Sequence, residues 1–219
     1  MPDKIIGVFA LDELIVPARH DGQQGKGEHS GDCQKHQAFD SFTAGTSHHA
    51  SIDATTEEEL DSLYHVHFKG VFFLTQKLLP LINDGGRIVN VSSGLTRITI
   101  PGSAPYASMK GAVEVLTRYL AKELGPRGIA VNTVAPGAIE TDFSGGMVRD
   151  NPELNRRVAD MTALGRAGVP DDIGPLIASL VGESHRWVMC NCSAARVKLQ
   201  HWAVIRNVCM SAAASGTNR

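Results

Sequence analysis

Two short apolar strands separated by one long helix constrain the fold of this chain most strongly. Arg87–Val91 and Ile129–Val134 are rich in β-branched residues, and Gly85-Gly86 precedes the first of them. Short runs of this kind with glycine boundaries predict buried strands. The helix between them extends to Leu124, where Gly125-Pro126 stops it. The order strand, loop, helix, strand predicts an open α/β sheet.

Polar side chains lie where such a sheet binds ligands. Ser92 and Ser93 follow the first strand at its carboxyl end, the edge at which open α/β sheets hold ligands. Tyr106 and Lys110 are four residues apart, so they project from one helix face. A phenol in water has a pKa of about 10, and a nearby cation favours the phenolate. Such a tyrosine could exchange a proton with an alcohol or carbonyl oxygen that a serine hydroxyl holds. The spacing Tyr-x-x-x-Lys alone, however, more often marks a surface pair on an amphipathic helix.

Three motifs in order give this pattern a family likeness. They are Asn90-Val91-Ser92-Ser93, Tyr106-x-x-x-Lys110 and Asn132-x-x-x-Pro136-Gly137, and Ser93 lies thirteen positions before Tyr106. Together they closely resemble the short-chain dehydrogenase/reductase family, over about residues 54–188. The resemblance implies a Rossmann-like, doubly wound parallel sheet. It also implies a nicotinamide-dependent oxidoreductase that interconverts an alcohol and a ketone by hydride transfer.

The resemblance implies a role for individual residues. It makes Tyr106 the acid/base, places Lys110 on the nicotinamide ribose and Ser93 on the substrate oxygen. His67 occupies the position of the family's asparagine that supports a proton-relay water, and it is either a polar substitute or a plain helix residue. The implied cofactor is NAD or NADP, and the substrate is a small alcohol or ketone whose identity stays open. The implied cofactor contacts are Asn90, Tyr106, Lys110, Pro136, Gly137, Ile139 and Thr141.

The two ends of the chain depart from the family. Residues 1–50 predict an irregular segment, 51–188 the family-like core, and 189–219 an unmatched tail. The chain lacks the family's Gly-x-x-x-Gly-x-Gly turn and Asn-Asn-Ala-Gly segment, and no Gly-Gly strand follows Val188. We therefore expect an incomplete sheet and a weak grip on the cofactor pyrophosphate, although Ile5–Leu11 could form one strand. The ends are either translated in a shifted frame or those of a genuine shortened paralogue.

Other helices and a lid are predicted around the core. Thr55 or Thr56 is a suitable N-cap for a helix over 57–79 with acidic residues in its first turn. Pro170 begins a helix to about Val181. Residues 143–168 resemble the family's mobile substrate lid. In the family, the helices equivalent to 57–79 and 105–124 pair across a two-fold axis, which implies a homodimer or homotetramer.

Composition limits the other functional classes. Charged residues make up 20% of the 219 residues, apolar residues 42%, and the net charge is −2, an ordinary soluble balance without a basic surplus for nucleic acid. Ile5–Leu11 is too short to span a bilayer, so we expect no membrane partner. The four cysteines lack common zinc or redox spacings, which predicts no metal site and reduced thiols in a cytoplasmic protein. The alternatives to an enzyme are a non-catalytic relative that self-associates through its long helices, and a product without a stable function.

Overall fold

The centre of the molecule is a parallel sheet of four described strands. The computed structural model describes residues 6–9, 47–182, 188 and 192–194. The strands are β1 (Ile6–Phe9), β2 (Arg87–Val91), β3 (Ala130–Ala135) and β4 (Cys192–Ala194), in the order β1-β2-β3-β4. Every neighbouring pair is parallel, and in the central pair Arg87 lies opposite Ala130. The predicted α/β class with a Rossmann-like parallel sheet is confirmed, and so is the predicted strand within Ile5–Leu11.

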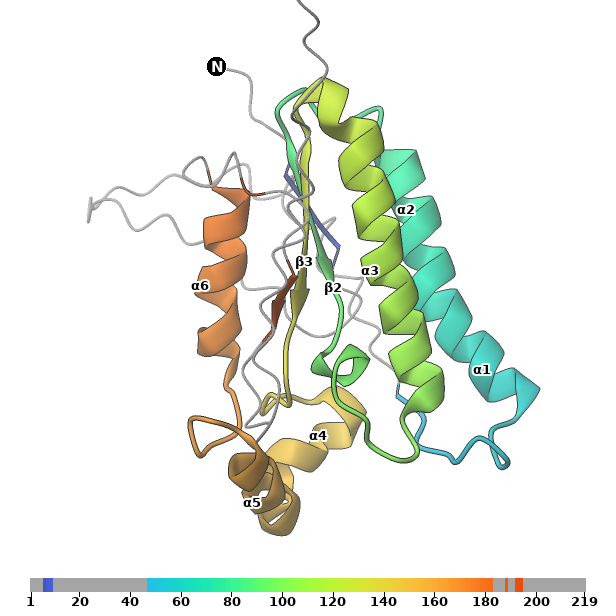
Figure 1. Ribbon diagram of the computed structural model, residues 1–219, viewed down its shortest axis with the longest axis vertical. Coiled ribbons are helices and arrows are strands. Elements are labelled where there is room, and N and C mark those ends of the chain that lie inside the picture. The colour runs from blue at the N-terminus through green and yellow to red at the C-terminus, as the bar shows by residue number, and fades with distance from the viewer. Residues whose placement is uncertain (1–5, 10–46, 183–187, 189–191, 195–219) are drawn as a thin grey trace, which may run out of the picture.

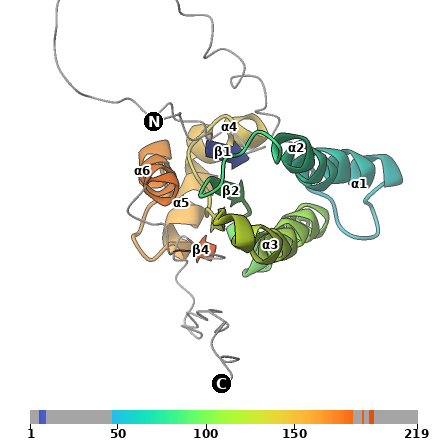
Figure 2. The same ribbon diagram turned by 90° about the horizontal axis from the view of Figure 1, so that it is seen from above.

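Helices cover both faces of this sheet and its carboxyl end. On one face lie α1 (Glu57–Tyr64), the π-helical turn η1 (His65–Lys69), α2 (Gly70–Leu78) and α3 (Ala104–Leu124), whereas α6 (Pro170–Val181) covers the other (Figures 1 and 2). Beyond the carboxyl ends of the strands lie α4 (Phe143–Asp150) and α5 (Pro152–Met161) (Figure 1). Two 3₁₀ turns, η2 (Gly94–Thr96) and η3 (Gly125–Arg127), flank α3 in sequence. The layers α, β and α are those of a doubly wound fold.

The two central strands are buried on both faces, as a covered parallel sheet requires. Every residue of β2 and β3 is buried. Ile88 and Val131 pack in a cluster with the carboxyl-terminal half of α3, and Val89 and Val134 pack against α6, including its Ile177. Each such apolar side chain contributes about 1.5–3 kcal/mol relative to an exposed one. These two clusters hold the layers together.

The helix signals of the sequence are confirmed at their ends. The Thr56 hydroxyl accepts a hydrogen bond from the Glu59 backbone N–H, and the Glu59 carboxylate accepts one from the Thr56 N–H. This capping box satisfies two of the amides that α1 leaves without a helical partner. The helix predicted to end at Leu124 does so, and α6 begins at Pro170 as predicted.

The structure corrects two expectations. The helix predicted over 57–79 is not one continuous α-helix, because the π-helical turn η1 interrupts it at residues 65–69. A single extra residue in a turn leaves no periodicity signal and often marks a functional site. In the tail 189–219 the family's final strand was not recognisable, yet Cys192–Ala194 pairs with β3 from Thr133 onward. The segment Cys-Ser-Ala is three residues long and contains no β-branched residue, so the strand left no signal in the sequence. Most of the predicted irregular segment 1–50 and of this tail lies outside the described residues.

The described helices and side chains bear on two other classes of site. Within the described ranges, no helix combines the length and the apolar composition needed to cross a membrane. In those same ranges, no three His, Cys, Asp or Glu side chains converge as a metal site needs. A reaction site in the described part is therefore expected at the carboxyl end of the sheet.

Candidate active site

The carboxyl ends of β2 and β3 are joined by backbone hydrogen bonds that extend the pairing past the strands. The Ser92 N–H donates to the Val134 carbonyl at 2.7 Å, and the Gly94 N–H donates to the Pro136 carbonyl at 2.7 Å. A Cβ at position 94 would lie 3.2 Å from the Pro136 oxygen, which explains the glycine there. The loop that carries Ser93 and the turn that carries Pro136 and Gly137 are thus held side by side.

Ser93 lies half-buried at the start of η2. Its hydroxyl accepts a hydrogen bond from the Leu95 N–H at 3.3 Å. Its carbonyl lies 2.9 Å from the hydroxyl of Thr96. The preceding Ser92 is instead almost fully buried, and its hydroxyl lies 2.7 Å from a carboxylate oxygen of Glu114 on α3. Of the two serines, Ser93 is therefore the more accessible one, and its role toward a substrate stays a prediction.

Tyr106 and Lys110 lie on the sheet-facing side of the first turns of α3. Their exposed fractions are 6% and 1%. The Lys110 Nζ lies 5.5 Å from the centroid of the Tyr106 ring and donates to the Val91 carbonyl at 3.2 Å. A cation this close to an aromatic ring is attracted by the ring's negative face. The predicted pair is therefore an internal one at the end of β2, which rules out the surface-pair interpretation.

His67 approaches the same tyrosine from the π-helical turn η1. It is fully buried, and its ring meets the Tyr106 ring edge-on, with the centroids 5.1 Å apart and the planes at 86°. The Phe143 ring lies 5.9 Å from the Tyr106 ring. Tyr106 is therefore near both an imidazole from η1 and a phenyl group from the start of α4. The imidazole places ring nitrogens, which can donate or accept a hydrogen bond, beside the tyrosine.

The segment after β3 brings the predicted nicotinamide contacts to the same end of the sheet. Ile139 forms a bridge with Gly168, and the Glu140 N–H donates to the Gly168 carbonyl at 2.9 Å. The Thr141 hydroxyl accepts from the Phe143 N–H at 3.2 Å and so fixes the turn into α4. Because Phe143 touches Tyr106, this turn lies beside the tyrosine.

Asn90 lies apart from the other predicted cofactor contacts. Its side chain is fully buried between β2 and α3 and donates to the Thr117 hydroxyl at 2.8 Å. The Thr133 hydroxyl donates to the same oxygen at 2.7 Å, and Thr117 donates to the Val113 carbonyl. Thr117, the centre of this buried polar network, lies seven residues, or about two turns, after Lys110 on α3. The role of Asn90 toward a cofactor stays a prediction, whereas the structure shows its hydrogen bond to Thr117 on α3 directly.

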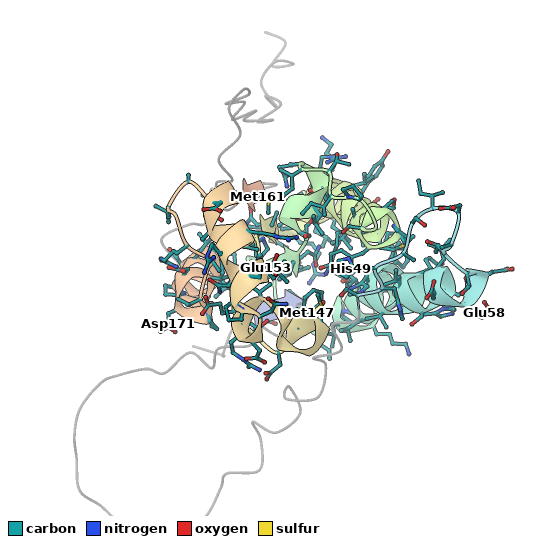
Figure 3. The ribbon with its side chains drawn as sticks, turned by 90° about the horizontal axis from the view of Figure 1, so that it is seen from below. His49, Glu58, Met147, Glu153, Met161 and Asp171 are labelled. Atoms are coloured by element: carbon teal, nitrogen blue, oxygen red, sulfur yellow. The ribbon has the colours of Figure 1, made fainter. Side chains whose placement is uncertain are left out.

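Two short helices, α4 and α5, lie at this end of the molecule, within the segment 143–168 that resembles the family's lid. Figure 3 shows Met147 of α4 and His49 toward the middle of this end, with Glu58 and Asp171 at its edges. Residues Ser144, Gly145 and Gly146 have positive φ values of 54°, 69° and 74°, which kink α4. The positive φ of Gly145 and Gly146 favours glycine, because it strains residues that carry a Cβ. The glycine pair thus forms a left-handed turn.

Ion pairs fix the two ends of the lid. Arg149 on α4 donates hydrogen bonds to the carboxylates of Asp150 and Asp142, and these bonds, first the one to Asp150 and then the one to Asp142, raise the pKa of the guanidinium. After α5, Arg166 donates two hydrogen bonds to Asp172 at 2.6 and 2.8 Å. These bonds, followed by one from the Val169 N–H, lower the pKa of the Asp172 carboxyl. Both pairs are partly exposed, so they orient the lid more than they stabilise the fold.

Sequence reasoning missed two groups that hold the site together. The Thr117 hydroxyl accepts hydrogen bonds from buried side chains of both central strands. The Glu114 carboxylate accepts hydrogen bonds from the loop around Ser93. The signal was spacing, because Glu114 and Thr117 follow Lys110 on α3 at four and seven residues and so share its face.

A separate cavity of about 550 Å³ lies on the other side of α3. It is lined by the loop 95–103 and by residues such as Ala107 and Gly111, but not by Tyr106 or Lys110.

Comparison with known proteins identifies the family. A family model described as enoyl-(acyl carrier protein) reductase matches residues 36–193, a range that contains the predicted 54–188. A short-chain dehydrogenase/reductase of Serratia marcescens has a similar solved structure, with a TM-score of 0.64 and 30% identity, over 68% of this chain and 60% of that one. The chain belongs to the short-chain dehydrogenase/reductase family.

Two further relatives show what kind of members it resembles. The crystal structure of the angucycline C-6 ketoreductase LanV with bound NADP has a TM-score of 0.65 and 34% identity, over 69% of this chain and 58% of that one. An uncharacterised oxidoreductase of Methylorubrum extorquens is 37% identical over 145 residues, which are 66% of this chain and 58% of the relative. The chain therefore spans somewhat over half the length of the relatives it matches.

Proposed function

We propose that this chain is an NAD(P)-dependent oxidoreductase that interconverts an alcohol and a ketone. The observation that carries the proposal is the buried cluster of Tyr106, Lys110 and His67 at the carboxyl end of the sheet, beside the loop of Ser93. The family membership and the resemblance to a ketoreductase with bound NADP support the same reaction class. This end of an open α/β sheet is also where such folds bind their ligands.

Each residue has a chemical task in this proposal. Tyr106 gives a proton to the carbonyl oxygen during reduction or takes it from the alcohol during oxidation. Lys110 favours the phenolate because its cation is held 5.5 Å from the ring in a nearly water-free environment, where charge interactions are strong. Ser93 donates a hydrogen bond to the same substrate oxygen. His67 holds or relays the proton of Tyr106 from the inner side.

The described residues fit the nicotinamide end of the cofactor. The Lys110 ammonium suits ribose hydroxyls, and the half-buried Thr141 hydroxyl and the backbone at Ile139 suit a carboxamide. When bound, NAD(P) supplies or accepts the hydride. The described ranges contain no glycine-rich turn between a strand and a helix for the pyrophosphate. We therefore expect binding that depends on Lys110 and Thr141 to an unusual degree.

The first experiment is a turnover assay with paired variants. The purified chain is incubated with NADPH or NADH and a panel of aliphatic and aromatic ketones, and cofactor oxidation is compared with alcohol formation. We expect equal amounts of both, and a loss of about 10²-fold or more in Ser93→Ala if that hydroxyl orients the oxygen. Ser108→Ala on the outer side of α3 is the matched control and should keep full activity. A folded chain that oxidises no cofactor with any ketone contradicts the proposal.

A second candidate function is self-association through the helices on one face. These helices expose large apolar side chains that no described segment covers, namely Leu60, Tyr64, Phe72, Phe73, Val115 and Tyr119. Because α1, α2 and α3 lie side by side on that face, the same surface on a second copy would cover them (Figure 2). We propose a homodimer or homotetramer formed there, and a cytoplasmic location in keeping with the cysteine spacing.

Light scattering tests this association with a matched pair of variants. Tyr119 is 64% exposed on α3, and Leu164 is 77% exposed after α5 on the lid. Tyr119→Lys should shift the mass toward the monomer, whereas Leu164→Lys should leave it unchanged. A monomeric parent chain at micromolar concentration rules out the association and leaves the enzymatic proposal intact.

A further inference from the structure

Glu114 lies on the same helix face as the proposed acid/base pair. It follows Tyr106 and Lys110 by two turns and one turn of α3, so the three side chains point to the same side. Its side chain is only 16% exposed. A carboxylate so placed has to find donors, because a buried charge without hydrogen bonds is costly.

Three donors to this carboxylate come from the loop that contains Ser93. One carboxylate oxygen of Glu114 lies 2.7 Å from the Ser92 hydroxyl, 2.7 Å from the Thr96 hydroxyl and 3.0 Å from a guanidinium nitrogen of Arg97. The second oxygen accepts from the other Arg97 nitrogen at 3.2 Å. The single carboxylate thus binds residues on both sides of Ser93.

The single proton on each hydroxyl determines which acceptor it donates to. The Ser92 hydroxyl lies 3.2 Å from the Lys110 carbonyl but only 2.7 Å from the Glu114 carboxylate. A hydroxyl has one proton, and a charged acceptor at the shorter distance forms the stronger bond. Ser92 therefore donates to Glu114. By the same rule the Thr96 hydroxyl donates to the Glu114 carboxylate at 2.7 Å and not to the Ser93 carbonyl at 2.9 Å, so Glu114 binds the neighbours of Ser93 on both sides.

We propose that Glu114 is a positioning residue for Ser93, an inference that rests on the proposed function. Among the described contacts, the Ser93 hydroxyl has a local bond to the Leu95 N–H and none to α3. The distance between the Ser93 loop and Tyr106 is therefore set by the neighbours of Ser93 that Glu114 binds. An error of about 1 Å in such a distance costs about 10²-fold in rate. The bond to the partly exposed Arg97 adds little stability by itself.

A double-mutant cycle distinguishes positioning from general support of the fold. Glu114→Ala should lower kcat by about tenfold or more with a small change in the cofactor KM, and Glu114→Gln should recover much of the loss because it keeps an acceptor. In the Ser93→Ala background, Glu114→Ala should cost less than about twofold, because the residue acts through Ser93. Glu153→Ala, which removes an exposed i,i+4 pair with Arg157, is the control. An equal loss in both backgrounds overturns the inference.

Hydrogen exchange tests the same inference without any turnover. In the full chain, the amides of residues 93–98 should exchange about tenfold faster in Glu114→Ala than in the parent or in Glu153→Ala. Arg97→Ala removes one donor at a partly exposed side chain and should give a smaller increase while keeping the fold. Unchanged exchange of this loop in the Glu114 and Arg97 variants overturns the inference. A parent chain without turnover contradicts the proposed function, and the exchange data then decide on Glu114 alone.

Discussion

The two halves of α3 face the same sheet with different chemistry. Its carboxyl-terminal half packs Leu120 and Leu124 against Ile88 and Ile129 near the start of the strands. Its amino-terminal half places charged and polar groups, among them Lys110, at the ends of the same strands. The two halves are joined at Thr117, where the buried polar network begins. One helix thus supplies core at one end of the sheet and reactive groups at the other.

This difference separates stability from activity along one element. Apolar contacts tolerate no polar substitution but carry no chemistry, whereas buried polar groups cost stability and are retained where they act. Variants in the carboxyl-terminal half should therefore unfold the chain, and variants in the amino-terminal half should inactivate it while it remains folded. The predictions below test this separation, from the largest expected effect to the smallest.

Lys110→Met should abolish most turnover without unfolding the chain. Methionine fills a similar volume but removes the cation beside Tyr106 and the bond to the Val91 carbonyl. We expect kcat to fall by about 10²–10⁴-fold, the range for loss of acid/base catalysis. Steady-state kinetics and a thermal melt of the same samples measure both effects. A variant that is inactive because it is unfolded would break the separation.

Ile88→Ala should do the reverse. Ile88 is fully buried in the cluster with Leu120 and Leu124. Removing three carbons from such a site costs about 2–5 kcal/mol of unfolding free energy. Denaturant titration measures this loss, and turnover per folded molecule should stay within about twofold of the parent. A large fall in turnover of the folded fraction would show that the two halves are coupled.

Thr117→Val tests the junction between the halves. Valine keeps the shape but leaves the Asn90 amide and the Thr133 hydroxyl without their common partner. A buried donor that loses its acceptor costs about 1–3 kcal/mol. Chemical denaturation should show this loss, with a smaller effect on turnover than Lys110→Met. A neutral result would mean that water or a rearranged Asn90 replaces the bond.

Asp172→Asn should have a small effect that depends on pH. Hydrogen bonds from Arg166 and Val169 depress the folded-state pKa of Asp172, so its stabilising contribution is present above the unfolded pKa of about 3.9. That contribution is lost as the pH falls through the folded-state pKa. Melting temperatures of parent and variant should therefore differ slightly at pH 7 and converge in strong acid. A difference that grows as the pH falls contradicts this assignment.

The sequence predicted the helices and strands whose residues follow a periodic apolar pattern or a motif spacing. The strands β2 and β3, the helix α3 with its stop at Leu124, and the closeness of Tyr106 and Lys110 all follow from periodicity and spacing. The π-helical turn η1 could not be predicted, because one added residue changes the backbone without changing composition. The strand β4 is three residues long and lacks an apolar run, so it also left no signal.

The sequence indicated the reactive groups of the site but not the residues that support them. The roles of Ser93, Tyr106 and Lys110 came from family motifs and stay predictions, although the structure brings the last two together. Glu114 and Thr117 belong to no motif, because their partners lie on another element and become visible only in three dimensions. The spacing of residues along the sequence does not reveal hydrogen bonds between different elements.

The most direct test of the central claim is the single-turnover reduction of a ketone by NADPH with the parent and Tyr106→Phe. Phenylalanine keeps the ring that contacts His67 and Phe143 and removes only the hydroxyl. We predict that the parent forms alcohol and that the variant binds NADPH equally well but forms alcohol at least about 10²-fold more slowly. Alcohol formation at the parental rate by Tyr106→Phe would contradict the assignment of the acid/base, and with it the account of this site.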